Sequence, residues 1–251
     1  MSRRANNVGF SQRVRLEWLE RTANLVLAGA DKAGINSRLQ ELLRDKVSIG
    51  GDAERGNREK IITILMKVWV NVPSEFEAFR NDGLVMLKRL SRDQHIIVHW
   101  GMVMAIYPFW AAVGSHVGRL LKLQGTAAAV HIQRRMREQY GERETVSRAA
   151  RRVIRSFYDW GVLDTTNVKG VYQRGRSIPL RDPKLIAWLI EASLYSRTNG
   201  SAGITDLIEN PSLFPFRIES VSAEKVVAGS SRLELYRQGL DDDLIILQTR
   251  G

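Results

Sequence analysis

The side chains with the most distinctive chemistry in this sequence are four arginines within eight consecutive positions. If residues 146–160 form a helix that turns about 100° per residue, these arginines lie on one side and apolar residues lie on the other. The first side holds Arg148, Arg151, Arg152 and Arg155, with Asp159 below them, and the second holds Val146, Ala149, Ala150, Val153, Ile154 and Phe157. Guanidinium groups suit phosphate oxygens and guanine edges because each offers a planar fork of donors. The spacing predicts a helix that packs by one side and binds nucleic acid by the other.

Basic residues also come directly before and after this segment. They belong to an expected helix over 127–140, to the turn that follows it, and to an expected β-hairpin, or wing, over 162–180. The candidate DNA-binding residues are Arg134, Arg135, Arg137, Arg143, Arg148, Arg151, Arg152, Arg155, Lys169, Arg174 and Arg176. A charged helix face is often only a solvated surface. Because the neighbouring elements are basic as well, we favour double-stranded DNA as the partner. RNA, an acidic protein and an anionic membrane face are the alternatives.

The distribution of charge supports a polyanionic partner. The chain of 251 residues carries 38 basic and 27 acidic side chains, a net charge of +11. Residues 119–181 alone hold fourteen basic and five acidic side chains, so most of the excess lies in this segment. A concentrated positive charge attracts nucleic acid. The sequence has no cysteine, which excludes a disulfide scaffold and a cysteine nucleophile and suits a reducing cytoplasm.

Other candidate sites are weaker. His95 and His99 have the i, i+4 spacing of two metal ligands on a helix, but no third ligand follows nearby, so we expect ordinary, partly buried histidines. The acidic run 241–243 is best explained as a polar hairpin turn. Phosphate-binding, dinucleotide-binding and nucleophile-elbow motifs are absent from the sequence. We therefore expect no catalytic residues, no metal and no cofactor.

The elements that position the basic residues can also be predicted. The N-terminal half should form successive helices: one from Ser11 to Gly29, one from about Asn36, one from Asn57, and one over 75–90 capped by Ser74. Helices over 108–123, 127–140 and 146–160 should follow, the second capped by Thr126 and the third by Thr145. A hairpin would then pair residues 162–163 with residues 177–180. Three helices followed by a small hairpin is the order of a winged helix-turn-helix.

Residues 94–118 contain no Lys, Arg, Asp or Glu and are long enough to cross a bilayer. His95, His99 and His116 interrupt this stretch, and Pro108 should break it. We therefore expect two buried helices that meet near Pro108 rather than a membrane span.

The last part of the chain should be a small α+β region. It contains an expected helix over 184–195 and a hairpin in which residues 232–237 pair with residues 244–247. The predicted fold is mainly α. It comprises a helical N-terminal bundle over 1–107, a winged helix-turn-helix over 108–181, and the α+β region over 182–251.

This layout resembles the BrxA family of bacterial BREX phage-defence islands. The likeness covers about residues 10–180 and lies in a helical N-terminal half, the apolar stretch HIIVHWGMVMAIYPFW at 95–110, and the segment QRRMREQYGERETVSRAARRVIRSFYDWGVL at 133–163. The resemblance implies a cytoplasmic, non-enzymatic protein that binds duplex DNA. Such a protein would act beside a methyltransferase and other defence-system proteins. An assembly scaffold that docks an acidic protein and an RNA-binding helical module are the alternative functions.

Overall fold

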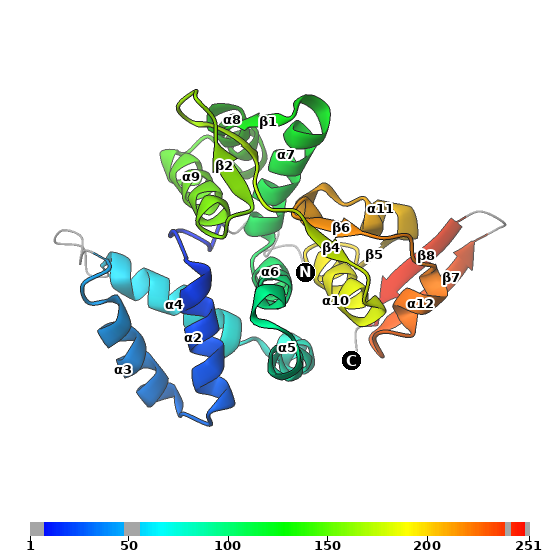
Figure 1. Ribbon diagram of the computed structural model, residues 1–251, viewed down its shortest axis with the longest axis horizontal. Helices are drawn as coiled ribbons and strands as arrows, with labels where there is room; N and C mark the ends of the chain where they lie inside the picture. Colours follow the sequence, from blue (N-terminus) through cyan, green and yellow to red (C-terminus); the bar gives the residue numbers. More distant parts are fainter. Residues whose placement is uncertain (1–7, 48–55, 239–241, 249–251) are drawn as a thin grey trace.

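A computed structural model describes residues 8–47, 56–238 and 242–248, and its centre is the helix α6, His95–Ile106 (Figure 1). Every residue of α6 from Ile96 to Ile106 is buried, as expected for a helix that is apolar on all sides. Helices α2, α4, α5, α7 and α10 pack against it. Trp188 of α10 lies so close to Gly101 that a Cβ atom there would approach its indole nitrogen to 2.3 Å. The core is therefore organised around α6.

The N-terminal part consists of helices, as predicted. They are α2 (Leu16–Leu27), α3 (Lys32–Leu43), α4 (Asn57–Trp69) and α5 (Glu77–Arg89), with the 3-10 turns Ser74–Phe76 before α5 and Arg92–Gln94 before α6. Three predicted starts were wrong. Helix α3 begins at Lys32, capped by Asp31, and not near Asn36. Residues 11–15 are not helical because they pack against a later helix, described below. Ser74 begins a 3-10 turn instead of capping α5, whose first residue is Glu77.

A partly buried carboxylate joins α2 to α6. Glu20 accepts hydrogen bonds from His95 Nδ1 at 3.0 Å and from His99 Nε2 at 2.8 Å. His99 is fully buried and its Nδ1 has no partner among the described residues, so the ring proton belongs on Nε2. The two histidines with metal-ligand spacing thus both donate hydrogen bonds to the Glu20 carboxylate, and these bonds hold α2 against α6.

The middle of the chain contains three helices and a three-stranded antiparallel sheet. In chain order these elements are α7 (Pro108–Gln124), β1 (Thr126–Ala128), α8 (Ala129–Tyr140), α9 (Glu144–Asp159), β2 (Leu163–Thr165) and β3 (Val171–Arg174). The strand order is β1-β3-β2. The three helices lie where they were predicted, and so does the end of α9, where Gly161 has a φ of +71°. The predicted cap of α9 was wrong: the helix begins at Glu144, so Thr145 lies inside it.

The strands of this part differ from the prediction in two respects. Thr126 lies in β1, which pairs with β3, so it does not cap α8. The hairpin partner of β2 is β3, which lies between the two predicted strands, and not residues 177–180. Those residues contain β4 (Ile178–Leu180), which pairs in parallel with β6 (Phe216–Ile218). The hairpin is therefore shorter than predicted and closes earlier in the chain.

The C-terminal region is α+β, as predicted. Its helices are α10 (Pro183–Tyr195), α11 (Ile204–Ile208) and α12 (Ala223–Val227), with a 3-10 turn at Pro211–Leu213. Besides β6, its strands are β5 (Ser201–Gly203), β7 (Leu233–Gln238) and β8 (Asp242–Leu247), which form a sheet in the order β5-β8-β7. β7 pairs with β8 as predicted, but the pairing extends further toward the turn. Asp242 and Asp243, predicted to lie in the turn, belong to β8, and Asp241 lies outside the described residues. An ion pair between Arg232 and buried Glu191 ties this sheet to α10.

The described residues therefore form a mainly helical protein with small sheets, which confirms the coarse prediction. The three-domain division stays a prediction. No single helix in the described ranges is long and apolar enough to cross a membrane. Helices α6 and α7 meet the length and composition requirements only as a pair, and they are bent by 116° at Tyr107 and Pro108.

The Glu20 cluster predicts acid-dependent stability. Burial alone would raise the pKa of Glu20, but hydrogen bonds and charge from His99 and His95 outweigh it and lower this pKa from 4.5 to about 2. Burial lowers the pKa of His99 below 6.5 despite Glu20. Both groups bind more protons in the unfolded chain than in the folded one, so the free energy of unfolding should fall as the pH falls below about 6.5, and further between 4.5 and 2.

We expect Glu20→Ala to lower the free energy of unfolding at pH 7 by about 1–3 kcal/mol, because two ring nitrogens lose their acceptor. It should also flatten the loss of stability between pH 4.5 and 2. Urea denaturation across this pH range measures both effects. Glu17→Ala is the matched control, since Glu17 is exposed on the same helix and lies 3.6 Å from an exposed Arg15. Equal effects of the two substitutions would contradict the role given to Glu20.

Candidate nucleic-acid interface

Helix α9 has one packed side and one arginine side. All six residues of its predicted apolar side are buried, and Phe157 lies deepest, with its ring centroid 4.9 Å from that of Trp100 and 4.6 Å from that of Trp110. These aromatic contacts join α9 to α6 and α7. Because one side of α9 is fixed in the core, the rotation of the helix about its axis is fixed too, and the arginines must face outward.

The N-terminal segment before α2 occupies part of the arginine side. Arg13 forms a two-pronged ion pair with Asp159, and the Val14 backbone N–H donates to Ser156 Oγ at 2.9 Å. The Trp160 indole donates to the Val14 carbonyl at 3.0 Å. Arg152 donates to the carbonyl of Ser11. Residues 11–14 thus cover the Arg152–Asp159 edge of α9.

Arg152 therefore differs from the other three arginines. Burial lowers its pKa, and the charges of Arg148 and Arg151 lower it further. It remains a cation, but its bond to Ser11 gives it a structural role. Asp159, expected to partly neutralise the arginines, is instead taken up by Arg13.

Three arginines remain open to solvent on the other edge of α9. We call Arg148, Arg151 and Arg155 the arginine face. Arg148 and Arg151 are exposed, and the guanidinium of the partly buried Arg155 lies 5.3 Å from the ring centre of Tyr158. The acid nearest this face is Glu144, 3.7 Å from Arg151, and both side chains are more than half exposed. Such an exposed pair is weak and screened by salt, so it leaves Arg151 available to an anion.

The β2–β3 hairpin places one predicted residue at its tip and two at its base. Lys169 is exposed in the turn, which also holds Gly170 with a φ of +81°. Arg174 lies at the other end of β3, opposite Leu163, and donates to the carbonyl of Phe214. Arg176 lies beyond β3 beside Gly161. Of the three cations predicted to lie in the wing, only Lys169 is therefore at its tip, because the second strand was assigned to the wrong residues.

The predicted cations of α8 and of the turn after it lie in three different places and do not form one surface. Arg137 faces α9, where it donates to Ser147 Oγ at 2.9 Å and to Glu142 at 3.0 Å, so it braces two helices. Arg143 is exposed between α8 and α9 and donates to the Tyr140 carbonyl. Arg134 and Arg135 are exposed and belong to a pocket beside α7.

The cations that remain free near α9 are therefore fewer than predicted: the arginine face, Arg143 and Lys169, with Arg176 exposed beyond β3. The structural role of Arg13 was missed. The one feature of the sequence that indicates an ion pair here is Asp159, an acidic residue on an otherwise basic side of the helix. That signal cannot locate a partner 146 residues away.

Neither a metal centre nor a match to a known protein accompanies this surface. In the described part of the chain, no group of three or more His, Asp or Glu side chains is arranged to hold a metal ion. Comparisons with models of known protein families, with curated proteins and with solved structures gave no match to this chain.

Proposed function

We propose that this chain is a non-enzymatic protein that binds double-stranded DNA through a winged helix-turn-helix formed by residues 108–174. The order α7-β1-α8-α9-β2-β3, with its three strands arranged as β1-β3-β2, supports this assignment. In such modules the last helix enters the major groove and the hairpin contacts the backbone beside it. Here the last helix is α9, and the hairpin carries Lys169.

The observation that carries the proposal is the arginine face. It presents three guanidinium groups on one side of a helix whose other side is fixed in the core. Arg143 and Lys169 add two exposed cations before α9 and at the hairpin tip. Phosphate contacts of this kind fix a protein on a duplex without reading its sequence. We therefore propose DNA binding whose affinity is dominated by charge.

The resemblance to BrxA proteins extends this proposal to a role in phage defence. A cytoplasmic protein of that kind would act on DNA beside other defence-system proteins. An acidic protein or RNA could also bind a basic helix face, and the experiments below distinguish these partners.

The first prediction concerns salt. If the arginine face, Arg143 and Lys169 contact five phosphates, the logarithm of the association constant for duplex DNA should fall with the logarithm of salt concentration with a slope of about −4.5, from about 0.9 per phosphate. Fluorescence anisotropy at several salt concentrations measures this slope. A slope near zero would contradict the proposal. Tighter binding of single-stranded RNA, or of an acidic protein, than of the duplex would favour that partner instead.

The second prediction separates the arginine face from general basicity. Arg151→Ala with Arg155→Ala should weaken duplex binding at least tenfold, or about 1.4 kcal/mol. Each substitution should change the free energy of unfolding by about 0.5 kcal/mol or less, because neither side chain is buried. Anisotropy and urea denaturation measure the two quantities.

The charge-matched control is Lys88→Ala with Arg89→Ala, on the exposed surface of α5. It removes the same charge and should change DNA affinity less than threefold. If the two pairs weaken binding equally, net charge alone governs binding and the assigned geometry is wrong.

A further inference from the structure

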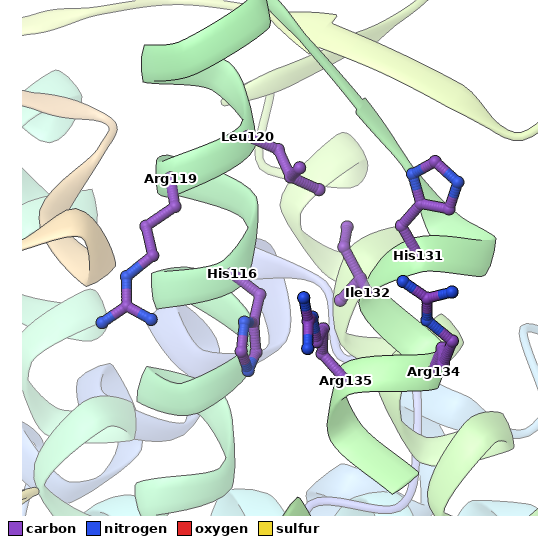
Figure 2. A pocket seen from close by; sticks show the side chains of 7 residues that line it. All are labelled: His116, Arg119, Leu120, His131, Ile132, Arg134 and Arg135. Atoms are coloured by element: carbon purple, nitrogen blue, oxygen red, sulfur yellow. The ribbon is translucent and has the colours of Figure 1, made fainter. Parts of the chain in front are cut away.

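A second cationic site lies between α7 and α8. A pocket of about 370 Å³ is lined by His116, Arg119 and Leu120 from α7 and by His131, Ile132, Arg134 and Arg135 from α8. Figure 2 shows His116 and Arg135 facing each other across the gap between the two helices, with Leu120 and Ile132 beside them. The volume falls within the range of about 300–1,000 Å³ that is typical of small-molecule sites.

The positive charge of the pocket is only partly neutralised. Glu138 lies 3.0 Å from Arg135 and 3.7 Å from Arg134, so one carboxylate serves two guanidinium groups. All three side chains are close to half exposed or more, and such pairs are weak in water. Arg119 is exposed and forms no ion pair with any described residue. The pocket therefore keeps a surplus of guanidinium donors, the groups that suit phosphate oxygens.

His116 adds a group that titrates. Burial lowers its pKa below 6.5, and the charges of Arg119 and Arg135 lower it further, whereas a hydrogen bond with Gln139 and the charge of Glu138 oppose this shift. His116 is thus mostly neutral at pH 7. A bound anion would favour its protonated form, because it would offset the two arginines.

The pocket lies on a different side of α8 from the contact that α8 makes with α9, the helix that carries the arginine face. Arg137 marks the side of α8 that faces α9, since it bonds to Ser147. At about 100° per residue, Arg135 lies about 160° away from Arg137 around the helix, and Arg134 about 60° away on the outer side. Arg135, which lies beside His116 of α7, therefore points away from α9, the helix that carries the arginine face.

We propose that the α7–α8 pocket binds a small phosphorylated molecule, with its phosphate against Arg119, Arg135 and His116 and its less polar part against Leu120 and Ile132. Two kinds of ligand could supply this phosphate: a free phosphorylated metabolite of up to nucleotide size, or a phosphodiester of nucleic acid. The position of the pocket favours the free metabolite. This inference does not depend on DNA binding by α9.

The test uses the full chain with pyrophosphate and adenosine monophosphate as probes, followed by calorimetry and by amide chemical shifts. We expect saturable binding of at least one probe, with shifts at α7 and α8. Arg119→Gln with Arg135→Gln should weaken it at least tenfold, whereas Arg151→Ala with Arg155→Ala and the Lys88 and Arg89 control pair should change it less than twofold. The absence of saturable binding, or equal losses in all three variants, would overturn the proposal.

Two further measurements complete the test. With sulfate, which stays a dianion from pH 7.5 to 5.5, binding should tighten as the pH falls. His116→Gln should remove most of this dependence, whereas His131→Gln, at the other histidine of the lining, should leave most of it. A pH dependence that His116→Gln leaves intact would overturn the role of His116. Duplex DNA distinguishes the two phosphate sources: Arg119→Gln with Arg135→Gln should change its affinity less than threefold. A loss as large as that caused by the α9 pair would make the pocket part of the DNA surface and overturn the assignment to a free metabolite.

Discussion

The burial of α6 is the constraint on which the rest of this structure depends. A helix of twelve residues that is apolar on every side must be covered on every side, and the described chain supplies α2, α4, α5, α7 and α10 to do so (Figure 1). The cover comes from both ends of the sequence. Trp100 shows the consequence most clearly, because its ring contacts Trp110 of α7, Phe157 of α9 and Phe214 near the C-terminal region. Packing around α6 therefore also fixes the inner side of α9.

The N-terminal segment fixes α9 from the outside. Its bonds to Arg152, Ser156, Asp159 and Trp160 hold the C-terminal half of the helix between the core and residues 11–14. A surface whose backbone is held in this way loses little conformational freedom when a ligand binds, so more of the interaction energy appears as affinity. The arginine face thus combines mobile side chains with a rigid helix.

The sequence alone predicted the parts of the fold that have strong periodicity. The helices α7, α8 and α9, and the buried side of α9, follow from apolar residues at helical spacing. The short strands were harder. Three residues such as Thr126–Ala128 carry no alternation, and Thr126 before a helix resembles a cap. β3 contains Gln173 and Arg174, which look like loop residues, because one side of this small sheet faces solvent.

The sequence predicted which residues could form the candidate site, but not which residues they contact. The sequence identifies which arginines share a side of α9, because that depends only on positions within one helix. It does not reveal that Arg152 bonds to Ser11, that Arg174 bonds to Phe214, or that Arg135 lies beside His116, since these contacts join residues far apart in the chain. Ten of the eleven predicted cations thus separate into a free surface around α9, structural braces and a pocket, and Arg176 lies exposed beyond β3.

The most direct test of the central claim, that duplex DNA lies against the arginine face, is photo-crosslinking from single positions. A photoreactive benzoylphenylalanine in place of Arg148 should crosslink to a bound duplex, because this position is an exposed member of the arginine face. The same group in place of Arg134, which is equally exposed but lines the α7–α8 pocket, should crosslink little or not at all. Efficient crosslinking from position 134 with none from position 148 would contradict the account.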